Sequence, residues 1–371
     1  MLTSQDDLPG HQTPAPFAQA GQGDPRFTER WWYTAHPLDG RPLILDVGFG
    51  YYPNRGVMDA FAGVTVGRTQ HNFRASRQLG DRPLDLEVGP LRLQIVEGHR
   101  LHRLTLRDNA SGIAFELDFE ACFPAAQEKQ SRRERDGVVD EDLARVAQFG
   151  RWQGWLQVAG ERHAVSASDW WGQRDRSWGV RSEMRTDWAV PPMQTHKQFF
   201  WTWSMFQTPS VGVSLFLKER EADRPYYLSG AEFQRDAHGR VRKREVRELA
   251  HALEWADDPL GQTLTAGEFI LRFDEGPARV LRVEALPARY YLKGGLYGGW
   301  GGWNHGDDRG AYAEAHDRWN LDDPLTRERA RTLGDHVMRV HTEGEQGIGI
   351  SEYGVATGYG RYPLPQKHPA L

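Results

Sequence analysis

The chain has 371 residues, of which 39% are hydrophobic and 26% charged, and its formal net charge is −5. This composition is typical of a globular protein with two ordinary domains or one large domain, and the weak negative charge excludes an electrostatic nucleic-acid platform. A single cysteine, Cys122, excludes an internal disulfide, and no apolar run is long enough to predict a membrane-spanning helix. The N-terminal residues lack the pattern of a signal peptide, so we expect a cytoplasmic protein.

The first half of the chain predicts short antiparallel strands after a loose N-terminal arm, residues 1–25. Alternating apolar and polar residues between turn residues are typical of half-buried strands. The predicted strands are 27–40, 43–49, 57–66, 70–77, 91–97, 100–107 and 113–120. The charged stretch 125–142 is predicted to form an exposed loop or a short helix, and 151–168 returns to strands.

The stretch 168–181, S-D-W-W-G-Q-R-D-R-S-W-G-V-R, combines five charged residues with three tryptophans. Buried charges need partners or a cavity, and a solvated loop does not need three indoles. We interpret the stretch as a strand–turn element whose acids, Asp169 and Asp175, lie at the edge of an aromatic pocket. The alternative is a buried Asp–Arg pair that holds a turn.

The second half repeats the β pattern, with predicted strands at 198–207, 211–218, 226–235, 240–248, 269–273, 280–286, 335–341 and 347–354. In 198–207, Trp201, Trp203 and Met205 fall on one face, where the two indoles either pack in a core or contact a ligand. A glycine-rich aromatic loop is expected at 292–310 and one short helix at 321–331. The two halves predict two similar antiparallel barrels, 26–192 and 193–371.

Several side chains could carry acid–base chemistry. An apolar wall could raise the pKa of Asp175 and make it a proton donor, while nearby arginines could lower it or hold a polar end of the substrate. Glu29 lies in an aromatic cluster with Trp32 and either serves the site or pairs with an arginine. His196 is a candidate general base or a surface residue.

The second half offers fewer candidates. Tyr353 either points into the barrel or is a packed tyrosine with a bonded hydroxyl. A metal site from His305, Glu314, His316 and Asp317 is disfavoured, because their spacing matches no common ligand pattern. The sequence also lacks the G-x-S-x-G signature of a serine hydrolase.

Two motifs resemble a known family. E-R-W-W-Y-T-A-H-P-L-D-G (residues 29–40) resembles the opening of the AttH-like and carotenoid 1,2-hydratase (hydroxyneurosporene synthase) superfamily, and R-D-R-S-W-G-V-R (residues 174–181) resembles its central turn. The resemblance implies an all-β fold of two lipocalin-like barrels in tandem. It also implies a ligand cavity at or between the barrels and chemistry without a metal or cofactor. Asp175 falls on the acid of the motif and Trp178 on its aromatic position, but Arg174 stands where the hydratases have histidine.

We therefore predict a cofactor-independent enzyme of the lyase, hydratase or isomerase type, preferably a lyase, acting on a small apolar or aromatic molecule. An isoprenoid or a lignin-derived phenolic dimer would be such a substrate, and a homodimer is left open. The predicted catalytic residues are Asp175, Arg174, Arg181, His305 and Tyr353. The predicted substrate-binding residues are Glu29, Trp32, Trp171, Trp178, His196, Trp201 and Trp203. The alternative function is a non-catalytic lipocalin-like carrier, which would need few ionisable groups in its cavity.

Overall fold

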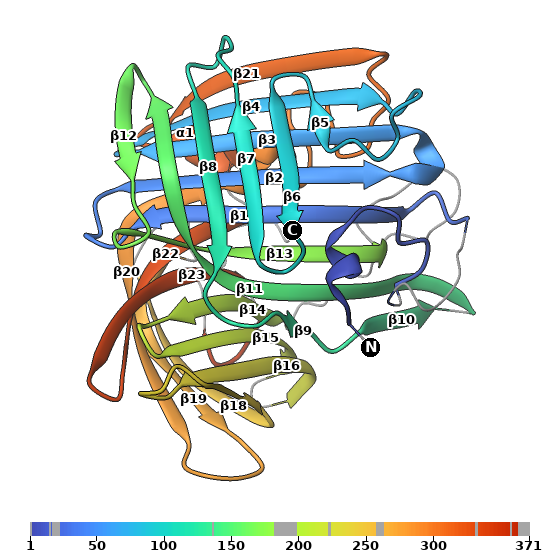
Figure 1. Cartoon of the computed structure of the whole chain (residues 1–371). Coiled ribbons are helices and arrows are strands. Elements are labelled where there is room, and N and C mark those ends of the chain that lie inside the picture. The colour runs from blue at the N-terminus through green and yellow to red at the C-terminus, as the bar shows by residue number, and fades with distance from the viewer. Residues whose placement is uncertain are drawn as a thin grey trace.

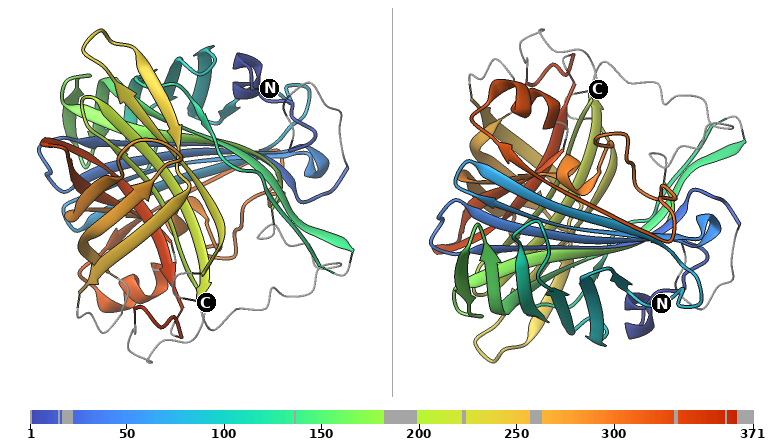
Figure 2. Two further views of the ribbon diagram at one scale, coloured as in Figure 1. Left: turned by 90° about the horizontal axis from the view of Figure 1, so that it is seen from below. Right: turned by 90° about the horizontal axis from the view of Figure 1, so that it is seen from above.

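The computed structural model describes residues 2–14, 16, 23–135, 137–181, 199–221, 224–256, 263–330, 333–356 and 358–362. Within these residues the chain forms two curled antiparallel sheets, called sheet A and sheet B here, which adjoin each other (Figures 1 and 2). The predicted all-β fold of two tandem barrels is confirmed.

Sheet A contains the strands of the first half of the chain and one strand from the second half. Its strands are β1 (Phe27–Pro37), β2 (Leu43–Tyr52), β3 (Val57–Val66), β4 (Thr69–Gln78), β5 (Glu87–Val88), β6 (Leu91–Glu97), β7 (Leu101–Leu106), β8 (Ala114–Ala121), β9 (Ala126–Gln127), β10 (Ser131–Arg135), β11 (Val138–Val158), β12 (Glu161–Val165), β13 (Trp170–Val180) and β21 (Tyr312–Asn320). The 3₁₀ turns η1 (Ser4–Asp7) and η2 (Pro53–Arg55) accompany it.

Sheet B contains the remaining strands of the second half. They are β14 (Phe200–Gln207), β15 (Val211–Glu221), β16 (Arg224–Arg235), β17 (Val241–Glu245), β18 (Glu248–Trp255), β19 (Leu264–Arg272), β20 (Arg279–Tyr291), β22 (Gly334–Thr342) and β23 (Glu345–Val355). The turn η3 (Leu292–Gly295) and the helix α1 (Pro324–Ala330) lie on either side of β21 in the chain, and α1 confirms the predicted short helix.

Side chains alternate along a strand, so each sheet has two faces. In both sheets, each face carries buried apolar residues. One face of sheet A encloses a core that includes Trp31 and Trp152, and one face of sheet B encloses a core that includes Phe269 and Met338. We call these the interiors of barrels A and B. The opposite faces meet in a third cluster, called the junction, which contains Trp32 and other residues from both sheets.

The junction forms where β20 packs on β2 and β3 and where β23 packs on β13. Gly63 of β3 permits this approach, since a Cβ there would lie 2.1 Å from the ring of Tyr290 on β20. No bulkier residue fits under that ring without moving it. A residue without a side chain therefore sets the distance between the two sheets at this point.

The charged stretch 125–142 is not the predicted loop or helix. It contains β9, β10 and the start of β11, and β10 pairs with β11 as a hairpin. Arg132 and Asp142, 2.9 Å apart, and Arg133 and Asp140, 2.6 Å apart, pair across the hairpin. Opposite charges on neighbouring strands stabilise their pairing. Because the stretch has no alternation of apolar residues, its sequence pattern does not predict these strands.

Two further strands were not predicted, and the described part of the N-terminal arm is not loose. Residues 248–255 form β18 and residues 312–320 form β21, and each lies at the end of a sheet. Asp6, Asp7 and His11 are buried against sheet A, because their charges have partners there. Among the described residues, no helix has the length and apolar character needed to cross a membrane.

Candidate functional site

The central motif becomes β13, a buried strand between β1 and β11 in the middle of sheet A. Its residues alternate between two faces, so the motif is divided rather than forming one site. Trp171 lies in the junction, and Asp175 shares its face. Arg174, Arg176 and Trp178 lie on the other face, toward the interior of barrel A.

Arg174 binds the N-terminal segment. Its guanidinium donates to both carboxylate oxygens of Asp7, at 2.7 and 3.1 Å, and to the amide oxygen of Gln148. His102 Nε2 lies 2.7 Å from Asp7 as well. Burial alone would raise the pKa of Asp7, but Arg174 and His102 outweigh it and hold that pKa well below its usual range. These contacts make Arg174 part of a closed ion-pair network.

The other predicted residues of this face join the same network. Arg176 pairs with Glu29 and lies 3.9 Å from the ring centre of Trp31. Trp178 stacks on His11 with ring centres 4.1 Å apart. Glu29 therefore follows the alternative of pairing with an arginine, and neither Glu29 nor Trp178 lies beside Asp175.

Tyr353 lies in the interior of barrel B. Its hydroxyl is 2.9 Å from His336 Nδ1 and accepts a hydrogen bond from the backbone N–H of Leu264 at 2.9 Å. Burial raises its pKa to about 12. Tyr362, near the end of the described chain, packs in the same interior with its hydroxyl 2.6 Å from His251 Nδ1. The C-terminal residues thus fill barrel B as the N-terminal residues fill barrel A.

The junction brings together four of the predicted tryptophans. Trp32 of β1 and Trp203 of β14 meet edge to face with ring centres 5.4 Å apart. Trp171 belongs to the same cluster, and Trp201 is partly buried against it. His196 lies outside the described residues.

Asp175 faces this aromatic cluster and is paired with a cation. Its Oδ2 lies 3.1 Å from Nε of Arg145. The side chain of Asp175 is 14% exposed and that of Arg145 is 15% exposed. Arg145 also lies 3.4 Å from Glu128, and Glu128 accepts the indole N–H of Trp203 at 2.7 Å. Solvent therefore reaches a charged group that stands among indoles.

Three carboxyls that were not predicted lie near one another, and the charge of Asp175 acts on two of them, Asp335 and Glu352. Asp46 comes from β2, Asp335 from β22 and Glu352 from β23, so both sheets contribute. The Asp335 carboxyl lies within hydrogen-bonding reach of both Asp46 and Glu352. Burial raises the pKa of all three well above the usual range, and their mutual repulsion adds to the effect. Carboxyls in this state retain a proton and can donate it.

The glycine-rich loop supplies a second group of side chains. His305 Nδ1 lies 3.2 Å from Oδ2 of Asp59, which also accepts the backbone N–H of Gly306 at 2.8 Å. Gly306 has φ +71°, a conformation that glycine adopts at little cost. The hydroxyl of Tyr52 donates to the other oxygen of Asp59 at 3.1 Å. These bonds fix the orientation of the His305 ring.

His305 has the properties of a general base. Burial and the charge of Arg30 lower its pKa, which keeps the imidazole neutral. Its Nε2 is buried and has no hydrogen-bond partner among the described residues. Its ring centre lies 4.8 Å from that of Tyr297. A neutral imidazole held at Nδ1 presents the lone pair of Nε2 to a substrate.

Tyr297 connects the imidazole to the carboxyls. Burial raises its pKa to about 12, and the charges of Asp175 and Glu352 contribute to the rise, whereas Arg30 and Arg181 act against it. Arg181 also donates to the hydroxyl of Ser177 at 2.7 Å. The charges of Asp175 and Glu352 therefore reach Tyr297, whose ring contacts that of His305.

The structure does not assemble the disfavoured metal site. Glu314, His316 and Asp317 lie on β21, where Asp317 pairs with Arg74 at 2.8 Å, while His305 faces Asp59. Among the described residues, no group of three or more His, Cys, Asp or Glu side chains is placed to hold a metal ion.

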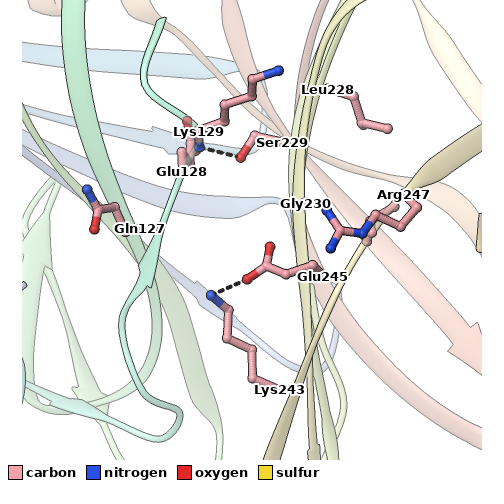
Figure 3. Close-up of a pocket in the computed structure, with 10 residues that line it drawn as sticks. Gln127, Glu128, Lys129, Leu228, Ser229, Gly230, Lys243, Glu245 and Arg247 are labelled. Carbon is pink, nitrogen blue, oxygen red and sulfur yellow. Dashed lines mark hydrogen bonds and ion pairs between the residues drawn. The ribbon is translucent and has the colours of Figure 1, made fainter. Parts of the chain in front are cut away.

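A separate polar pocket of about 400 Å³ lies between the β9 segment and strands β16 and β17 (Figure 3). Lys129 donates its backbone N–H to Ser229 there, and Lys243 pairs with Glu245 at 2.5 Å. Glu128 lines the pocket and connects it to Trp203 and Arg145. The polar lining suits water or a polar group better than an apolar substrate.

The two curled sheets define a protein with two tandem lipocalin-like barrels. The fold is similar to that of a Nitrosomonas europaea protein provisionally named AttH, with a TM-score of 0.57, 14% identity and coverage of 95% of this chain and 99% of that one. The chain belongs to the "Family of unknown function (DUF8625)", whose model matches residues 2–361.

Two further solved structures are more distant. Kievitone hydratase from Nectria haematococca has a TM-score of 0.42 and 13% identity, and covers 88% of this chain and 89% of that one. CghA with Sch210972 has a TM-score of 0.46 and 10% identity, with 89% of each chain covered. No curated protein matches the sequence.

The acids of the junction could have been suspected from the sequence. Asp46, Asp335 and Glu352 each interrupt a stretch that otherwise predicts a buried strand, in L-I-L-D-V, G-D-H-V-M and I-S-E-Y. An acid within such a strand must be paired or protonated. Their proximity to one another depends on how the two sheets pack.

Proposed function

We propose that this protein is a cofactor-independent acid–base enzyme of the lyase, hydratase or isomerase type, with its active site at the junction. The observation that carries the proposal is the trio Asp46, Asp335 and Glu352, three neighbouring carboxyls from both sheets that favour the protonated state. Such groups supply a proton donor at neutral pH.

The two ends of the site have complementary roles in this mechanism. Glu352, which is less buried than Asp46 or Asp335, donates a proton to a double bond or to a leaving hydroxyl. His305 accepts a proton from water, from a hydroxyl or from an acidic C–H of the substrate. Trp32 and Trp203 provide aromatic walls that stabilise positive charge on carbon through their π faces.

The role of Asp175 differs from that of a simple proton donor. It pairs with Arg145, and its charge raises the pKa values of Asp335 and Glu352. We therefore assign Asp175 to keeping the trio protonated. The positive charge of Arg181 acts against the rise in the pKa of Tyr297 and adds to the lowering of the pKa of His305, which keeps the imidazole neutral.

The substrate is a small, largely apolar or aromatic molecule, because indoles and tyrosines surround the polar groups. A carrier would avoid burying several ionisable groups beside its ligand, since each costs desolvation free energy. The junction contains such groups, which favours an enzyme over the carrier alternative.

The test is mass spectrometry after incubating the purified protein with acyclic terpenoids, polyenes and phenolic dimers. Addition of water identifies a hydratase, loss of water or formaldehyde a lyase, and a new retention time at constant mass an isomerase. Glu352→Gln should lower turnover by about 10²–10⁴-fold. The matched control is Tyr353→Phe, whose side chain lies on the opposite face of β23 and which should keep turnover near that of the wild type.

Two outcomes would reject the proposal. Full turnover in Glu352→Gln would exclude the carboxyl trio as the source of the proton. Quenching of tryptophan emission by a compound that is never converted would favour the carrier.

A further inference from the structure

The strand β21 ends sheet A with one edge unpaired by any described strand. Its nine residues pair with β4 along the other edge, from Tyr312 opposite Arg77 to Asn320 opposite Thr69. Figure 1 shows β21 along the outer border of the sheet, beside β4. An edge strand of this length offers backbone N–H and C=O groups to a further strand.

The strand is held firmly on its inner side. Asp317 pairs with Arg74 at 2.8 Å and accepts a hydrogen bond from the side-chain amide of Asn72 at 2.7 Å. Trp319 is buried, with 5% of its surface exposed. These contacts keep β21 extended and in register with β4, so its outer edge is available as a preformed template.

The exposed side chains of β21 are complementary to themselves. Glu314, His316 and Arg318 are exposed and alternate with more buried residues. If two copies of β21 pair antiparallel about a two-fold axis at His316, Glu314 of each copy lies opposite Arg318 of the other. Such a pair forms twice in the symmetric contact, and opposite charges directly across a strand pair are stabilising.

Neighbouring registers lose this match. An axis at Ala315 places Glu314 opposite His316, and an axis at Asp317 places His316 opposite Arg318. Moving the axis by one residue, which shifts the pairing by two residues, therefore replaces two Glu–Arg pairs by weaker or repulsive ones and specifies a single register.

The strands at the other three ends of the two sheet paths do not suit self-pairing. β17 would place Arg242 opposite Arg244 about Lys243, and β18 would place Glu248 opposite Glu254 about His251. β5 has only two residues. Like charges across a strand pair are destabilising, so among these four path ends β21 is the one whose charges favour a second copy.

We propose that β21 is a dimer interface, at which a second copy of this chain adds its own β21 antiparallel about His316 and joins the two A sheets. This interface is separate from the junction site and does not depend on the proposed function.

The test is sedimentation analysis of the full chain over a range of concentrations. The wild type should show a reversible dimer of twice the 42.3 kDa chain mass. Arg318→Glu places glutamate opposite glutamate twice and should raise the dimer dissociation constant by about tenfold or more. The double variant Glu314→Arg/Arg318→Glu exchanges the charges and should restore the wild-type dissociation constant.

Arg240→Glu is the matched control, because it makes the same charge change at a side chain that is 79% exposed and lies outside the edge strands, and it should leave dimerisation unaltered. Circular dichroism confirms that each variant is folded. A wild type that is monomeric at all concentrations would overturn the proposal, and so would a dimer that Arg318→Glu leaves intact or that the double exchange fails to restore.

Discussion

The barrel interiors and the junction differ in whether their buried acids have cationic partners. In barrel A, Asp7 pairs with Arg174 and Glu29 pairs with Arg176, so each buried acid has its own cation. The pKa of Asp7 is held below its usual range by Arg174 and His102, and the N-terminal segment is bound to the sheet. Buried pairs of this kind serve cohesion, because removing one partner leaves an uncompensated charge.

The junction has acids without matching cations. Asp46, Asp335 and Glu352 lie together, and Arg145, whose charge acts on Glu352, already pairs with Asp175 and Glu128. The three carboxyls are consequently driven toward the protonated state. Buried charge is costly in both regions, but only the junction leaves the cost uncompensated, which is typical of a site that performs chemistry.

The largest expected effect concerns the histidine at the junction. His305→Gln should lower kcat/KM by about 10²–10⁴-fold, because it removes the base. Since the pKa of His305 is lowered from 6.5, the wild-type rate should stay high down to pH 6.5 and fall only below it. A pH–rate profile of kcat/KM measures both. A wild-type profile that falls already above pH 6.5 would contradict the assignment.

The next effect concerns the interior of barrel A. Asp7→Asn should lower the free energy of unfolding by about 3–5 kcal/mol, because it leaves Arg174 buried without its counter-charge. The pKa of Asp7 is lower in the folded chain, so its stabilisation is present above the unfolded pKa of about 3.9 and is lost as pH falls. Urea unfolding at several pH values measures the difference.

The control is Asp85→Asn, since the Asp85 side chain is 57% exposed and lies 3.8 Å from Arg82. That variant should change stability by less than about 1 kcal/mol. Equal decreases in the free energy of unfolding for Asp7→Asn and Asp85→Asn would show that the buried pair of Asp7 with Arg174 contributes no more to stability than an exposed pair.

A smaller effect is expected from Gly63→Ala, which alters the contact between the sheets. The added methyl would lie 2.1 Å from the ring of Tyr290, and overpacking of this kind costs about 1–3 kcal/mol. Turnover should fall as well, because the carboxyl trio includes residues from both sheets. Gly67→Ala is a poor comparison because of its positive φ, so Ala62→Val, on the barrel A face of β3, tests overpacking away from the junction. If Gly63→Ala and Ala62→Val lowered turnover and stability equally, the contact of Gly63 with Tyr290 would not have a specific role in positioning the carboxyl trio.

The smallest effect has the opposite sign. Asp335→Asn should leave the free energy of unfolding at pH 7 unchanged or raise it by about 1 kcal/mol. The pKa of Asp335 is raised in the folded chain, so the carboxyl costs stability as pH rises above the unfolded pKa of about 3.9. The advantage of the variant should grow between pH 4 and 7 in urea unfolding. A loss as large as that expected for Asp7→Asn would place Asp335 among the structural pairs.

Much of the fold could be predicted from the sequence because strands carry their own signal. The period-two alternation in 57–66 predicts β3 with the bounds that the structure has, and Trp203 and Met205 lie together on the junction face as their spacing indicates. The predictions failed where no alternation of apolar residues marks the strand, as in the β10–β11 hairpin, whose charges pair across the strands, and in the polar edge strand β21.

The central motif shows the limit of local reasoning. Its composition correctly indicated buried charge among indoles, yet Arg174 and Asp175 are neighbours in sequence that point to opposite faces of β13. The period of two that identified other strands would have separated them if the motif had been interpreted as one strand without a turn.

By itself, the sequence determined the β architecture, the aromatic junction face and the presence of acids in buried strands, because these follow from alternation and from the cost of burying charge. Only the tertiary structure decided which acids meet. Asp46 and Glu352 are about as far apart in the chain as two strands can be, and they become neighbours because a glycine and a tyrosine allow sheet B to rest on sheet A. Proximity across a sheet contact depends on packing geometry, which no local pattern of residues encodes.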